Sequence, residues 1–147
     1  MDVKNFTLRL HGIEMIEKSY TETEPPPENQ EFKFDFNAKG AIDPDRKLLI
    51  VLLDISIRKG DEPKVLAKLT TAIAFEMPNM EQELPKQENG QYGIPPELDT
   101  LVKSVSISTA RGILFSELRG TPLHRAILPL IQLPIAQPIL QQPVPAS

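Results

Sequence analysis

Apolar and polar residues alternate along three successive stretches of the chain: residues 32–39, 53–58 and 65–77. In the first of these, Phe32, Phe34 and Phe36 are separated by charged residues. Alternation with a period of two places the apolar side chains on one face of a β-strand. The pattern therefore predicts a sheet with one apolar face.

Four strands are expected from these patterns and from the turn signals between them: about residues 3–20, 31–39, 47–58 and 64–77. In the first strand the apolar phase changes at Gly12, which predicts a bulge or a sharp bend. Residues 40–45 have the composition of a turn, and residues 59–63 that of a hairpin connection. Strands linked in this way predict a four-stranded antiparallel sheet.

A helix is expected from about Glu97 to Leu118, because Pro96 suits a first helical turn and acidic residues follow it. Residues 104–109 are weak helix formers, but the flanking apolar residues keep helical spacing and predict a continuous helix. Its small residues would let another helix approach closely. Gly120 marks its end. The predicted fold class is α+β, with one long helix packed on one face of the sheet.

The remaining segments are predicted to lack regular structure. Residues 78–96 are a long polar stretch, expected to form a solvated connection. Residues 123–134 are apolar but interrupted by Pro129, which predicts an extended segment. Residues 135–147 are rich in Pro and Gln, which predicts a flexible tail after a single domain over residues 1–134.

Composition narrows the possible functions. The chain has 147 residues, a net charge of −4, two histidines and no cysteine. These values exclude a cysteine-based zinc site and thiol catalysis, and they argue against nucleic acid as a partner and against a bound metal or cofactor. The longest apolar run, residues 48–53, is far shorter than the roughly 20 residues of a membrane span. Without an apolar signal segment at the N-terminus, a cytoplasmic location is expected.

No constellation of residues indicates catalysis. Glu14 and Glu17 are expected to be solvated surface charges, and Ser108 and Ser116 lie outside the sharp strand-to-helix turn that a nucleophilic serine needs. We therefore expect a binding protein and not an enzyme.

The order of four strands, long loop, long helix and extended proline-containing segment resembles the SecB family of protein-export chaperones over residues 3–134. The segments that carry the resemblance are Ser108–Gly112 within the helix and Arg119–Pro122 at its exit, leading into Leu128 and Pro129. The resemblance implies a homotetramer with helices between sheets. It also implies ATP-independent holding of unfolded polypeptides, preproteins for export among them, and delivery to the SecA motor.

Two features depart from the family pattern. Family members commonly have a second helix at the C-terminus, which prolines at positions 134, 138, 143 and 145 disfavour here. The family's motor-docking surface is acidic, whereas the outward face of the fourth predicted strand has Glu76 as its single acidic residue. Client holding is therefore better supported than delivery to SecA, and service to a toxin–antitoxin pair stays open.

Five residues are candidates for client binding. Met77, Met80 and Tyr92 are adaptable apolar groups at a strand end and in a long loop, a placement that suits a promiscuous groove. Phe32 and Phe34 are expected first as core beneath the helix and second as the rim of that groove. Two other classes remain open: a small-ligand carrier or enzyme on a helix-on-sheet fold, and an oligomerisation module that holds no client.

Overall fold

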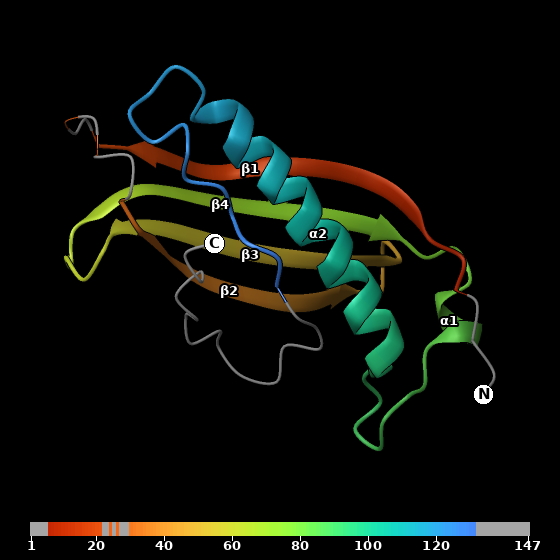
Figure 1. Cartoon of the computed structure of the whole chain (residues 1–147). Coiled ribbons are helices and arrows are strands. Elements are labelled where there is room, and N and C mark those ends of the chain that lie inside the picture. Colours follow the sequence, from red (N-terminus) through yellow and green to blue (C-terminus); the bar gives the residue numbers. More distant parts are fainter. Residues whose placement is uncertain (1–5, 22–23, 25, 27–29, 132–147) are drawn as a thin grey trace.

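The computed structural model describes residues 6–21, 24, 26 and 30–131. Its elements in chain order are β1 (Arg9–Tyr20), β2 (Phe32–Asp43), β3 (Leu48–Lys59), β4 (Val65–Glu76), α1 (Met80–Glu83) and α2 (Pro96–Glu117). The four strands form one sheet in the order β1-β4-β3-β2, and all neighbours are antiparallel. The long helix α2 crosses one face of this sheet (Figure 1). The predicted fold class is confirmed.

The sheet departs from the prediction where β2 ends. Gly40 was expected in a turn, but β2 continues to Asp43, and Gly40 pairs with Val51 of β3. The prediction of a turn at residues 40–42 is wrong because pairing with β3 and packing of Ile42 against the core outweigh local turn composition. The chain turns instead just after Asp43, where Lys47 has a φ of 56°.

Strand β1 has the irregularity predicted at Gly12. Its register with β4 shifts between Leu10 and Gly12, and again between Met15 and Glu17. The strand begins at Arg9 and not near residue 3, although Phe6 still packs against the core. Residues 3–5 and the predicted tail, 135–147, lie outside the described residues.

Helix α2 is continuous through residues 104–109, as predicted. Two hydroxyl groups there bond back to the preceding turn: Ser106 Oγ donates to the Val102 carbonyl at 2.7 Å, and Thr109 Oγ1 donates to the Val105 carbonyl at 2.8 Å. Burial of one helix face compensates for the weak local propensity. After Glu117 the chain leaves the helix through Gly120, whose φ is 79°.

The connection between β4 and α2 is more ordered than a solvated loop. It contains α1 and a tight reversal in which Lys86 pairs with Tyr92. Met80 and Leu84 within it are buried, while many of its polar residues are exposed. The prediction of a solvated connection is therefore right only for its polar positions.

Two clusters of buried side chains make the core. The first contains Phe34 and Phe36 of β2, the C-terminal half of α2 and residues of the segment that follows it. The second lies under the N-terminal half of α2 and includes α1. Along β4, Thr71 separates the residues of the first cluster from those of the second, and its hydroxyl is buried without a hydrogen-bond partner.

Candidate functional site

The structure places the five sequence-predicted binding residues in two separate groups. Met77 and Met80 are 0% and 1% exposed in the second core cluster, where Tyr92 packs partly buried beside them. Phe34 belongs to the first cluster, and Phe32 packs partly buried against it. In this conformation Met77, Met80 and Phe34 offer almost no surface, so their contact with a client stays a prediction that requires local opening.

One uncovered apolar row lies on β1. Leu10, Ile13 and Met15 are 45–56% exposed. Their register partners on β4 face the core, so all three side chains lie on the sheet face that carries α2. The helix packs over β3 and β4 and meets β1 near the C-terminal end of that strand, where the Lys18 ammonium donates to the Glu117 carboxylate at 2.8 Å. Leu10, Ile13 and Met15 stay exposed. Figure 1 shows β1 at one edge of the sheet.

A second uncovered stripe runs along the outer side of α2. Its members are exposed and follow one another at intervals of four and three residues: Leu101, Val105, Ser108, Gly112 and Phe115. This spacing is that of a coiled-coil seam, and the two small residues at its centre leave room for a partner backbone. The sequence shows that this segment has helical spacing but does not show which side of the helix faces the sheet. The four-three spacing of the stripe could have indicated a second contact side.

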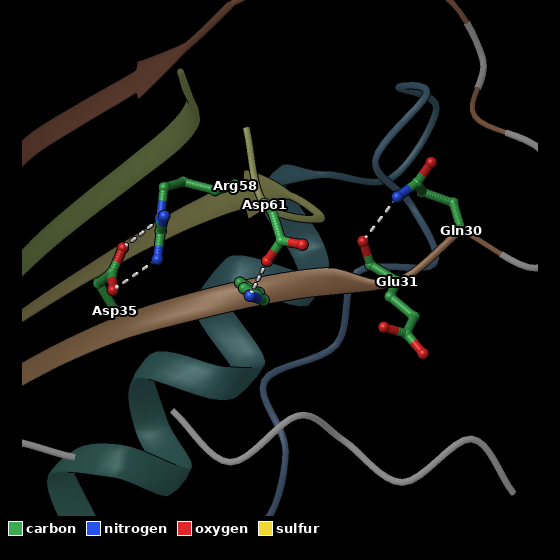
Figure 2. A network of polar contacts seen from close by, with 6 residues as sticks. Gln30, Glu31, Asp35, Arg58 and Asp61 are labelled. Atoms are coloured by element: carbon green, nitrogen blue, oxygen red, sulfur yellow. Dashed lines mark hydrogen bonds and ion pairs between the residues drawn. The ribbon is translucent and has the colours of Figure 1, made fainter. Parts of the chain in front are cut away.

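The sheet face opposite α2 carries polar side chains that pair with one another. The Arg58 guanidinium donates to both carboxylate oxygens of Asp35, at 2.7 and 3.1 Å (Figure 2). Thr70 donates to Asp54 at 2.6 Å, and Lys68 lies 3.6 Å from Glu17. These pairs link all four strands across the sheet. The pairs at Asp35 and Asp54 are partly buried and fix the geometry of the side chains on this face.

Two further charge pairs lie at opposite ends of β2. The hydrogen bond from Lys33 holds the pKa of Asp61 below its usual value, and that from Arg46 does the same for Asp43. Among the described residues, no group of histidine, aspartate and glutamate side chains is arranged to hold a metal ion. Within the same residues, no helix has both the length and the apolar character needed to cross a membrane.

The geometry thus defines a class of protein: a four-stranded antiparallel sheet with one long helix on one face and uncovered apolar side chains on β1 and α2. In sequence, neither a protein-family profile nor a curated protein matches this chain. In structure, the chain is similar to a SecB-like chaperone, Rv1957 of Mycobacterium tuberculosis, solved in complex with a ChAD peptide from the HigA1 antitoxin, Rv1956. The TM-score is 0.61 at 14% identity, over 85% of this chain and 90% of that one.

Proposed function

We propose that this protein is an ATP-independent holdase that binds unfolded polypeptide. The observation that carries the proposal is the fold, which is shared with a chaperone solved with a bound peptide. The uncovered apolar row on β1 supports it, because a holdase needs apolar surface that accepts many sequences.

The client class follows from the same observations. The M. tuberculosis chaperone binds a segment of an antitoxin, so we infer that an unstructured segment of a partner protein is a client, whether antitoxin or preprotein. Delivery to SecA has weaker support. On the outward face of β4, Glu76 pairs with Arg9, and on β2 Asp35 pairs with Arg58, which reduces the negative charge offered to a motor.

Self-association is the second part of the proposal. The uncovered stripe on α2 matches a helix–helix seam, which favours a homo-oligomer. We propose a tetramer built as a dimer of dimers, with this stripe as one of its interfaces.

The test is suppression of aggregation. A chemically denatured test protein is diluted into buffer with and without the purified chain, in the absence of nucleotide, and light scattering is followed. Equimolar protein should lower the scattering strongly, whereas an unrelated acidic protein at the same mass should not. Unchanged scattering would contradict the holdase. A small molecule retained in native mass spectrometry would instead favour the ligand carrier.

A further inference from the structure

The segment after α2 lies against the core without forming sheet bonds. Residues Ala126–Ile131, here named the strap, run beside the helix on the same face of the sheet (Figure 1). Within the described chain, residues 127–131 form no backbone–backbone hydrogen bond. Arg111 holds the strap instead: its Nε donates to the Leu128 carbonyl at 2.8 Å and its Nη2 to the Pro129 carbonyl at 2.9 Å.

The side chains of the strap give it a single large anchor. Leu128 is 2% exposed in the first core cluster, while Ala126 is buried but small. Ile131 is only partly buried, and Ile127 and Leu130 are 51% and 92% exposed. One leucine and one arginine therefore carry most of the attachment.

These contacts do not depend on a particular sequence. The Arg111 guanidinium recognises two successive carbonyl groups, which the backbone of another chain supplies where it takes the conformation of residues 128–129. Pro129 has no backbone N–H, so the contacts at this position need no N–H donor from the bound segment. The site of Leu128 requires an apolar side chain of about that size. The same contacts can thus be made by a segment of another chain.

We propose that the strap occupies a peptide-binding site in the client-free protein and that an extended apolar client displaces it. This inference rests on the proposed function and specifies its client. The client is a segment that can contain a proline and that has a leucine-sized side chain beside two free backbone carbonyls. Only molecules whose strap has left the site can bind such a client. The apparent affinity is therefore the intrinsic affinity multiplied by the fraction of those molecules.

The experiment loosens the strap without altering its site. The probe is a fluorescently labelled synthetic peptide with the sequence of residues 125–131, and its binding to the full chain is followed by anisotropy. Leu128→Ala should bind the probe about tenfold more tightly than the unaltered chain, because the strap loses its anchor. The matched control is Leu84→Ala, since Leu84 is 4% exposed in the other cluster.

Leu84→Ala weakens the core to a similar degree but frees no part of the strap site, so it should leave probe affinity unchanged. Equal affinity in all three proteins, or an equal gain in both variants, would overturn the inference. Circular dichroism at the assay temperature establishes that each variant is folded.

A second comparison tests the role of Arg111. In the Leu128→Ala background, Arg111→Met should remove most of the gain, because the probe loses both carbonyl contacts. Arg119→Met, at an exposed arginine just after the same helix, should not. Equal probe binding by these two double variants would show that the probe does not replace the strap.

The aggregation assay separates the two hypotheses. If the unaltered chain suppresses aggregation but Leu128→Ala gains no affinity for the probe, the strap inference fails and the holdase stands. If the unaltered chain does not suppress aggregation, the holdase itself fails.

Discussion

At the scale of single residues, Thr71 and Thr70 are neighbours on β4 with opposite surroundings. Thr71 points into the core, where its hydroxyl has no hydrogen-bond partner, whereas the Thr70 hydroxyl donates to Asp54 on the other face. A buried unpaired hydroxyl loses its hydration without compensation. The same threonine-to-valine change should therefore have opposite effects at the two positions.

Thr71→Val should raise the free energy of unfolding by about 1 kcal/mol, and Thr70→Val should lower it by a similar amount. Urea denaturation followed by circular dichroism measures both. A loss of stability in Thr71→Val would mean that the hydroxyl is satisfied in solution, for example by a buried water molecule.

Met80 and Tyr92 give a second comparison at the residue scale. From the sequence both are loop residues whose replacement by serine should be tolerated; the structure buries Met80 and leaves Tyr92 partly exposed. Met80→Ser should therefore lower the free energy of unfolding by about 3 kcal/mol, and Tyr92→Ser by clearly less. Equal urea midpoints for the two variants would show that the connection is not packed as described.

At the scale of elements, α2 has a side that faces the sheet and a side that faces away. Ile113 packs partly buried against the first core cluster, and Ser116, one turn further on, is exposed. Ser116 lies in the last turn of α2 and Ile113 just before it, so the helix dipole by itself makes an added negative charge more unfavourable at Ser116 than at Ile113.

Ile113→Asp should lower the free energy of unfolding by about 2 kcal/mol, while Ser116→Asp should lower it by less than about 1 kcal/mol. Thermal melts at one protein concentration compare the two. Similar melting temperatures would indicate that this side of α2 does not face the sheet.

At the scale of the whole molecule, the stripe on α2 is proposed to contact a second copy. Val105→Glu places a charge in the middle of this stripe, between Leu101 and Ser108. A buried unpaired charge at such a seam is strongly unfavourable, so the variant should dissociate while its circular dichroism spectrum is unchanged. Multi-angle light scattering gives the mass of the particle.

The control is Gln82→Glu, which adds the same charge at an exposed position of α1 and should keep the mass of the unaltered protein. A monomeric unaltered chain at micromolar concentration would contradict the assembly. Equal masses for Val105→Glu and the control would show that the interface does not involve the stripe on α2.

The alternation of residues 32–39 and 65–77 determined by itself that these segments are strands, because a period of two is a local property of the chain. The irregularity at Gly12 and the continuity of α2 were predictable for the same reason: phase and spacing are read along a single element. The fold class followed from the order of these elements.

Only the tertiary structure decided which faces are covered. A period of two places Ile13 on one side of β1 and Ile73 on one side of β4, but strand pairing decides that the two share a face, and the path of α2 decides that Ile73 is buried while Ile13 is 47% exposed. Burial of Met77 and Met80 likewise depends on residues distant in sequence that pack around them. Periodicity selects a face of an element, whereas the path of the rest of the chain decides whether that face becomes core or surface.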